Sequence, residues 1–191
     1  MERTRKRVVG VLGASLSDAP DGAHITAAER SAARLGEAVA ARGCVLITGA
    51  TTGLPARAAR ACRERGGLAV GVSPAANPEE HVSRYRLPDD GADVIVYTGF
   101  GLKGRNVITV RSADVVIVVG GATGTLNEFT IACDEGKVIG VLEGSGGVAD
   151  HIREIVAFCK KPVPGALIFE RDPETLLDRC LEAFERSRLP A

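Results

Sequence analysis

The sequence lacks any excess of charge and any long apolar segment. Its 24 lysine and arginine residues balance 24 aspartate and glutamate residues, so the formal net charge is zero. A chain without a basic excess has no overall electrostatic attraction for nucleic acid or for an anionic membrane. No apolar run approaches the roughly 20 residues of a membrane span, and the basic residues from Arg3 to Arg7 lead directly into a short strand pattern. We therefore expect a cytoplasmic protein that binds neither nucleic acid nor membrane.

The sequence also lacks the cysteine and histidine spacing of a metal site. Its five cysteines are odd in number and contain no C-x-x-C pair, so we expect reduced thiols that pack as small apolar side chains in helices or strands. The cysteines are Cys44, Cys62, Cys133, Cys159 and Cys180. The histidines are scattered and are expected at the surface or at helix caps; they are His24, His81 and His151. No metal site is predicted.

The sequence also lacks a P-loop motif, the context of a dinucleotide-binding motif and all signs of a second domain. No G-x-x-x-x-G-K-[ST] occurs, so P-loop chemistry is not expected. A literal G-x-G-x-x-G at Gly99, Gly101 and Gly104 lacks the context of a dinucleotide site, which requires the first βαβ unit and a later acidic residue. There is no internal repeat, linker or low-complexity segment. Residues 1–191 are therefore predicted to form a single domain with one core.

Strand and helix patterns alternate along the chain. This alternation predicts an α/β fold: a single Rossmann-like, doubly wound domain with a mostly parallel sheet of about six or seven strands flanked by helices. The predicted strands cover residues 8–12, 44–47, 68–72, 94–97, 115–119, 138–142 and 167–169. The predicted helices cover residues 28–42, 53–65, 105–112, 125–135, 152–159 and 173–188, the last with Asp172 as N-cap and Pro173 at its first position. Residues 73–93 are predicted to be a long loop.

The most informative segment is the run from Val115 to Glu128. Its five β-branched residues predict a strand buried on both faces, and the glycines that follow let the backbone turn sharply and approach a ligand. The free N–H groups and the dipole at the start of the next helix favour an anion such as a phosphate. The predicted phosphate cradle consists of Gly120, Gly121, Thr123, Gly124 and Thr125.

Glu128 follows this cradle in the first turn of the expected helix. A carboxylate repels a phosphate, so it would address a ribose hydroxyl or a proton that is being transferred. The alternative is structural: in a capping box, Glu128 would bond back to a free N–H group at the helix start. The glycine turn that precedes it favours the functional interpretation.

Other strands also end in turns built from small residues. In an open parallel sheet, ligands bind outside the carboxyl ends of the strands, where the strand order reverses. The first turn offers Gly13 and Ser15, and the second offers Thr48, Gly49 and Gly53. Together with the cradle, these turns predict a crevice for a nucleotide or a sugar phosphate.

The turn after the fourth strand supplies two further candidates, Arg105 and Asn106. They are expected to begin a helix beside the cradle, from which an arginine can pair bidentately with a phosphate. The alternative for Arg105 is a solvated arginine at a helix start. The neighbouring Lys103 and Arg111 are assigned to solvent.

These residues carry a resemblance to a known family. The segment from Gly120 to Glu128, with Gly104-Arg105-Asn106 before it, resembles the G-G-x-G-T-x-x-E signature of the LOG (Lonely Guy), lysine decarboxylase-like superfamily. The likeness covers nearly the whole chain and is closest to the branch of Rossmann-like nucleotide-binding and molybdenum-cofactor carrier proteins. Enzymes of the family are phosphoribohydrolases that release a free base from a nucleoside 5′-monophosphate. The resemblance implies that Arg105 and Glu128 occupy the two catalytic places, that no cofactor is required, and that the chain forms a homo-oligomer, either a dimer or a tetramer.

The sequence departs from the family pattern at three positions and in one spacing. Asn106 replaces a lysine, Leu102 replaces a methionine and Val119 replaces a proline, and one extra residue separates the glycine pair from Gly124-Thr125. Losing the lysine removes a charge beside the arginine that positions the substrate. These changes match the carrier-like branch better than the hydrolases.

Two functions follow from these observations. The first is a binding protein that holds a nucleotide, a phosphate or a molybdopterin-like ligand without converting it. The alternative is a nucleoside 5′-monophosphate phosphoribohydrolase that releases a free base and ribose 5-phosphate. In that enzyme, Glu128 would stabilise positive charge at the anomeric carbon or activate water, and Arg105 would position the phosphate or the base.

Overall fold

A computed structural model describes residues 5–15 and 26–188, which include one seven-stranded sheet. The strand order is β4-β3-β2-β1-β5-β6-β7, and each neighbouring pair is parallel. The strands are β1 (Val8–Gly13), β2 (Val45–Thr48), β3 (Leu68–Ser73), β4 (Val94–Tyr97), β5 (Val115–Val119), β6 (Val138–Leu142) and β7 (Leu167–Glu170). The predicted Rossmann-like α/β fold is confirmed, and the sheet is parallel throughout.

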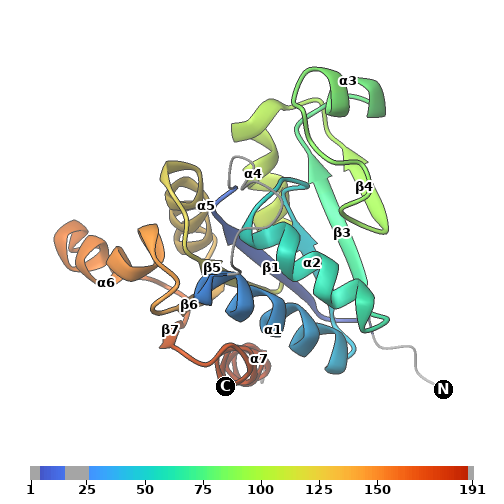
Figure 1. The fold of residues 1–191 in the computed structure, drawn as a ribbon. Coiled ribbons are helices and arrows are strands. Elements are labelled where there is room, and N and C mark those ends of the chain that lie inside the picture. Colours follow the sequence, from blue (N-terminus) through green and yellow to red (C-terminus); the bar gives the residue numbers. More distant parts are fainter. Residues whose placement is uncertain (1–4, 16–25, 189–191) are drawn as a thin grey trace.

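The described residues contain seven helices that cover both faces of the sheet; six connect successive strands, and the last follows β7 (Figure 1). They are α1 (Ala27–Ala41), α2 (Leu54–Glu64), α3 (Pro78–Ser83), α4 (Gly101–Ser112), α5 (Thr123–Asp134), α6 (Gly147–Cys159) and α7 (Pro173–Ser187). One core cluster contains residues of α1, α2 and α7, and a second contains residues of α4, α5 and α6. The sheet therefore separates two helical layers, as a doubly wound fold requires.

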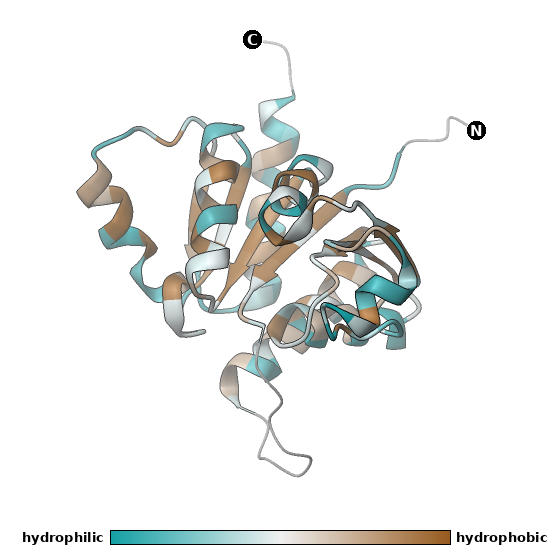
Figure 2. Ribbon diagram, turned by 90° about the horizontal axis from the view of Figure 1, so that it is seen from above, coloured by the Kyte–Doolittle hydropathy of each residue, from teal (hydrophilic) through white to brown (hydrophobic). Residues whose placement is uncertain are grey.

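Strand β5 shows why the pattern of the sequence leads to this architecture. All five of its residues are buried; Val115, Ile117 and Val119 face one core cluster, whereas Val116 and Val118 face the other. Because successive side chains of a strand point to opposite faces, a strand between two helical layers must be apolar at every position. Figure 2 shows the resulting arrangement, with apolar strands at the centre and hydrophilic residues on the flanking helices.

Two helix starts follow directly from local chemistry. The Thr26 side chain accepts a hydrogen bond from the Glu29 N–H group, and the Glu29 carboxylate accepts one from the Thr26 N–H group, which forms a complete capping box for α1. At α7, the predicted N-cap is confirmed: Asp172 Oδ1 accepts a hydrogen bond of 3.0 Å from the Thr175 N–H group, and Pro173 begins the helix. Such caps stabilise a helix by satisfying N–H groups that have no partner within it.

The prediction of a continuous loop over residues 73–93 is wrong, because this segment contains helix α3. Asn77 caps α3, because its side-chain Oδ1 accepts a hydrogen bond from the Glu80 N–H group, and Pro78 occupies the first turn of the helix.

Helix α4 begins at Gly101, four residues before Arg105, and α5 begins at Thr123, two residues before Thr125. Arg105 and Glu128 therefore lie in the second turns of their helices.

His81 is fully buried, which corrects the expectation of a surface or capping histidine. Its Nε2 lies 3.0 Å from the carbonyl oxygen of Pro88, and its Nδ1 lies 2.8 Å from Ser73 Oγ. Since a carbonyl only accepts, Nε2 carries the proton and Nδ1 accepts from the serine hydroxyl when the ring is neutral. His81 thus joins α3 to the end of β3. His151 is exposed as expected and lies 3.1 Å from Glu154, whereas His24 lies outside the described residues.

The cysteines are all free and divide by exposure. Cys44, Cys62 and Cys180 are buried and Cys133 is half-buried, in agreement with the prediction of small apolar side chains. Cys159 is exposed at the end of α6, so the expectation of a packed thiol is wrong there.

Among the residues that the structure describes, no three His, Cys, Asp or Glu side chains are grouped so that they could hold a metal ion. None of the described helices is both long and apolar enough to cross a bilayer.

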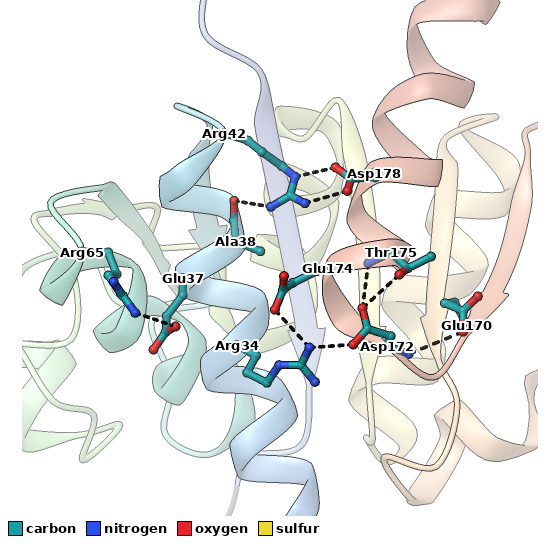
Figure 3. Close-up of polar contacts among 10 residues, drawn as sticks. All are labelled: Arg34, Glu37, Ala38, Arg42, Arg65, Glu170, Asp172, Glu174, Thr175 and Asp178. Carbon is teal, nitrogen blue, oxygen red and sulfur yellow. Dashed lines mark hydrogen bonds and ion pairs between the residues drawn. The ribbon is translucent and has the colours of Figure 1, made fainter.

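Ion pairs join α1 to its two neighbouring helices at the surface (Figure 3). Arg34 donates to Asp172 and Glu174 at 2.6 and 3.0 Å, and Arg42 Nη2 donates to Asp178 at 2.7 Å. We call these α1–α7 pairs the seam. On the other side of α1, Arg65 of α2's C-terminal end reaches Glu37 at 3.2 Å. The seam residues are one quarter to about half exposed, so water solvates both partners.

Candidate functional site

A cavity of about 210 Å³ lies at the carboxyl edge of the sheet, where the strand order reverses between β1 and β5. The chain runs from β1 outward through β2, β3 and β4, then crosses to β5 on the other side of β1. The loops that leave β1 and β5 consequently diverge and open a crevice between them, which is where open α/β sheets bind ligands. The sequence analysis placed its candidate site at this edge.

The cavity brings together seven of the thirteen predicted site residues. They are Gly13, Ser15, Arg105, Asn106, Gly124, Thr125 and Glu128. The cavity wall also contains residues that the sequence analysis did not include among the candidates, namely Ala14, Thr51, Leu102, Lys103 and Ala122. Lys103 is exposed as expected, but it also borders the cavity. Arg111 is exposed as expected and pairs with Glu135.

Arg105 and Glu128 form a buried ion pair that joins α4 to α5. Arg105 Nη1 donates to Glu128 Oε1 at 3.1 Å, and each side chain is only 8% exposed. Burial raises the pKa of Glu128 to about 7, although the positive charges of Arg105 and Lys103 act in the opposite direction. Burial also lowers the pKa of Arg105, but a guanidinium stays protonated in a protein. Glu128 is the sixth residue of α5, beyond the third helical position that a capping box requires, so the capping role considered for it does not apply.

The Arg105 guanidinium is only partly satisfied by its neighbours. Nη1 also donates to Asn106 Oδ1 at 3.0 Å, but the buried Nε atom has no hydrogen-bond partner in the described part of the chain. A buried donor without a partner costs roughly 1–3 kcal/mol, and more when the group is charged. Such a group at a cavity wall indicates a place where a ligand with acceptor atoms supplies the missing bond.

Gly49 makes room for this arginine. An ideal β-carbon on Gly49 would lie 2.2 Å from Arg105 Nη1 and 2.3 Å from its central carbon, well inside any allowed contact. The guanidinium therefore lies directly against the backbone of the turn after β2. Gly49 does not line the cavity; it fixes the position of the side chain that does.

Helix α5 points an uncapped N-terminus into the cavity. Its N-cap is Ala122, which has no side-chain oxygen to satisfy the first N–H groups, and its first turn contains no acidic residue. Gly124 and Thr125 line the cavity, whereas Thr123 is exposed outside it. The first N–H groups and the dipole of α5 make this end of the cavity favourable for an anion.

The glycine pair before α5 has a structural role that the sequence did not reveal. The carbonyl oxygens of Gly120 and Gly121 accept hydrogen bonds from Ala149 and Val148 at the start of α6, at 3.0 and 2.9 Å. The Gly120 N–H group donates to Ser145 Oγ at 2.8 Å. Both glycines have positive φ angles of 60° and 106°, a conformation that other residues rarely adopt. These bonds hold the start of α6 against the turn before α5, and neither glycine lines the cavity.

Two other predicted residues, Thr48 and Gly53, also shape the turn after β2 from outside the cavity. Thr48 is buried, and its Oγ1 accepts a hydrogen bond from the Ala50 N–H group at 3.2 Å. Gly53 precedes α2 with a φ of 79°, and the next N–H group, that of Leu54, donates to the Ala14 carbonyl. Through this bond the turn after β2 holds the turn after β1, where Ala14 and Ser15 line the cavity.

Asn106 completes the contact between α4 and α5. Its Nδ2 donates to Asn127 Oδ1 at 2.8 Å, while its Oδ1 accepts from Arg105. Asn106 and Asn127 thus form a neutral pair beside the ionic pair of Arg105 and Glu128. The charge that the family's lysine would supply at position 106 is absent, but Lys103 brings a lysine to the same cavity from one turn earlier.

Comparisons with known proteins agree with this architecture. An uncharacterized protein from Archaeoglobus fulgidus is 36% identical over 135 residues, which cover 71% of this chain and 79% of that protein. The solved structure of TM1055 is 24% identical with a TM-score of 0.78, covering 92% of this chain and 98% of that one.

Two further solved structures are a molybdenum cofactor binding protein and a molybdenum cofactor carrier protein. The first, from Rippkaea orientalis, is 27% identical with a TM-score of 0.74 and covers 98% of this chain and 100% of that one. The second, from Chlamydomonas reinhardtii, is 23% identical with a TM-score of 0.70 and covers 95% and 99%. The family model of the SLOG cluster4 family matches residues 6–177. The chain therefore belongs to the SLOG cluster4 family, within the LOG-like superfamily and beside its molybdenum-cofactor carrier branch.

Proposed function

We propose that this protein binds a small phosphorylated ligand, a nucleotide or a molybdopterin-like compound, in the cavity between β1 and β5. The observation that carries the proposal is the Arg105 guanidinium, which is buried at the cavity wall with an unpartnered Nε atom. A phosphate oxygen accepts hydrogen bonds from such a guanidinium and offsets its charge. The uncapped start of α5 and the Lys103 ammonium border the same space and favour the same charge.

The relatives support a ligand of this class. Two of the similar structures are named for binding or carrying the molybdenum cofactor. The residues of this chain fit the phosphate of such a compound: Gly124 and Thr125 offer backbone N–H groups, and Lys103 and Arg105 offer positive charge. The same donors fit the phosphate of a nucleotide, so the two compounds are alternatives for one site.

Isothermal titration calorimetry tests the proposal. The panel contains AMP, GMP, CMP, UMP and molybdopterin, with adenosine as a ligand that lacks the phosphate. We expect at least one phosphorylated compound to bind and adenosine to bind at least tenfold more weakly. Arg105→Lys keeps a charge but removes the fork-shaped donor set, so it should weaken binding about tenfold or more. Arg42→Lys, the same change in the seam, should leave binding unaltered, and equal losses in the two variants would refute the role of Arg105.

A second candidate function is hydrolysis of the bond between base and ribose, and Glu128 is the observation that favours it. Its pKa of about 7 leaves the carboxyl group partly protonated and partly ionised at neutral pH, which suits a general acid or base. The ionised form would take a proton from water as the water oxygen bonds to the anomeric carbon and the bond from that carbon to the base nitrogen breaks. The base leaves with the bonding electrons and takes up a proton, so the products are the free base and ribose 5-phosphate. Incubation with each monophosphate, followed by chromatography of the free base, tests this function. Base release should disappear in Glu128→Gln, and a bound monophosphate that stays intact in the wild type would exclude the hydrolase.

We also propose that residues 1–191 form one folding unit and assemble as a homo-oligomer, either a dimer or a tetramer. Five large apolar side chains are exposed on α3, β4 and the start of α4, and β4 is an edge strand. They are Val82, Val94, Val96, Phe100 and Leu102. Exposed apolar side chains on and near a free sheet edge favour association with a second chain. Light scattering after size exclusion should show an oligomer that Val96→Lys dissociates, and a monomeric wild type would contradict this expectation.

A further inference from the structure

The cavity has two ends with different electrostatic character. At the outer end, the Lys103 ammonium lies about 4.0 Å from the place where a β-carbon on Gly124 would sit, beside the N-terminus of α5. At the inner end, Glu128 pairs with Arg105. Lys103, Arg105 and Glu128 are the charged members of the cavity wall; the other described lining residues are neutral.

Lys103 differs from Arg105 in having no competing partner in the described part of the chain. Arg105 already donates to Glu128 and Asn106, whereas no hydrogen bond or ion pair of Lys103 occurs among the described residues. Its ammonium is therefore free to follow an anion at the start of α5. A lysine on a flexible stem acts as a compact point charge for a phosphate.

Glu128 is buried, and two charged side chains act on it. The charges that act on it are those of Arg105 and Lys103, and both stabilise its ionised form against the effect of burial. A dianion bound by Lys103 would cancel the positive field of the ammonium and add negative charge to the cavity that the buried Glu128 carboxyl group lines. Both effects disfavour the ionised carboxylate.

We propose that Lys103 binds the phosphate of the ligand and that occupancy of this subsite is coupled to proton uptake by Glu128. The inference rests on the phosphate site proposed above and adds that anion binding at Lys103 is linked to protonation of Glu128. By reciprocity, protonation of Glu128 strengthens anion binding by the same factor by which the anion strengthens proton binding. Anion affinity should therefore fall as the pH rises through the titration range of Glu128.

Sulfate is a suitable probe because it remains a dianion throughout the neutral range and contributes no proton of its own. Equilibrium dialysis with radiolabelled sulfate from pH 6 to pH 9, at constant ionic strength in chloride, measures the affinity directly. One coupled proton limits the slope to about tenfold per pH unit. In the wild type we expect a loss of about three- to tenfold in affinity between pH 7 and pH 8.

Three variants separate the two parts of the proposal. Lys103→Met should weaken sulfate binding about tenfold or more at every pH. Lys161→Met makes the same change at an exposed lysine that pairs with Asp134, far from the cavity wall, and should leave the affinity unaltered. Glu128→Gln fixes a neutral side chain at position 128, so binding should stay strong and lose its dependence on pH. Unchanged affinity in Lys103→Met, or a pH dependence that survives in Glu128→Gln, would overturn the proposal.

A measurement on the wild type covers the case in which Glu128→Gln does not fold. Calorimetry of sulfate binding at pH 7.5 in two buffers of different ionisation enthalpy counts the protons taken up, and we expect a value between zero and one. A count of zero would overturn the coupling. Binding of AMP at pH 8, measured in parallel, distinguishes the two proposals. A pH-dependent sulfate site that binds no member of the nucleotide and molybdopterin panel would refute the ligand class alone, whereas AMP binding with pH-independent sulfate binding would refute the coupling alone.

Discussion

The seam and the cavity both pair arginines with carboxylates, but they do so in opposite environments. In the seam, Arg34 has two carboxylate partners, and all of the groups remain partly in water. In the cavity, Arg105 has one carboxylate partner, little exposure and a donor without a partner. Exposed pairs contribute little to stability, whereas a buried pair is costly to form and costly to break. Counting ion pairs therefore does not distinguish a functional region from a structural one. The buried arginine with an unsatisfied donor marks the cavity as the candidate for function.

Removing the cavity arginine should give the largest effect. Arg105→Met leaves the Glu128 carboxylate buried without its partner, which should lower the free energy of unfolding by about 3–5 kcal/mol at pH 8. The loss should shrink at pH 6, where Glu128 becomes protonated. Urea unfolding followed by circular dichroism measures both values. Arg42→Met in the seam should cost less than about 1 kcal/mol, and equal losses for the two variants would remove the distinction between the regions.

The pH dependence of stability should come next in size. The folded state raises the pKa of Glu128 from 4.5 to about 7, so between these values the folded state binds more protons than the unfolded state. Stability from this group is consequently complete below pH 4.5 and is lost as the pH rises to about 7, by roughly 3 kcal/mol. Unfolding of Glu128→Gln over the same range should lack this decline. A wild type whose decline matches that of the variant would show that Glu128 titrates normally.

A β-carbon at Gly49 should have an intermediate effect. Gly49→Ala forces the turn after β2 away from the Arg105 guanidinium, at a cost of about 1–3 kcal/mol. Gly91→Ala provides the matched control, because its β-carbon would meet nothing closer than 3.9 Å and should change stability by less than about 0.5 kcal/mol. In the Arg105→Met background the cost of Gly49→Ala should fall, since the group that it displaces is gone. Additive losses would mean that Gly49 acts independently of the arginine.

The smallest effect concerns the seam residue that also caps a helix. Asp172→Ala removes the N-cap of α7 and a partner of Arg34, and should cost about 1 kcal/mol, most of it from the cap. The Thr175 N–H group and Arg34 lower the pKa of Asp172 to about 2. Its contribution is therefore present above pH 3.8 and disappears as the pH falls toward 2. Asp172→Asn, which retains a capping oxygen, should lose less than Asp172→Ala in thermal unfolding; equal losses in the two variants would assign the effect to the ion pair.

The sequence predicted the sheet well because its strands depend on local signals, and the same kind of signal led to the candidate site residues. Five β-branched residues in β5 require burial on both faces, and Asp172-Pro173 is sufficient to start α7. Arg105 and Glu128 were found from their positions next to glycine turns. Their direct contact, however, joins two helices that are separate in the sequence, and no local pattern encodes it.

The features that the sequence did not predict also depend on contacts between segments that are distant in the sequence. His81 is buried because Ser73 and Pro88 meet around it, and Lys103 borders the cavity because α4 begins one turn earlier than its glycine-rich start suggested. Gly120 and Gly121 were predicted as ligand contacts, and the structure adds that their carbonyl groups bind the start of α6, which follows more than 20 residues later. A glycine signals an unusual backbone but does not say whether a ligand or another part of the chain occupies the space beside it.

The pairing of β1 with β5 also has a consequence for the order of folding. Val9 pairs with Val115 and Gly13 with Val119, so the two strands that flank the cavity come from opposite halves of the chain. Contacts between such distant segments form slowly, because a long loop must close before they gain any stability. A nascent chain that ends before β5 already contains Gly13 and Arg105 but has no second wall for the cavity. The site can therefore form only after β5 has been synthesised and has joined β1 at the centre of the sheet.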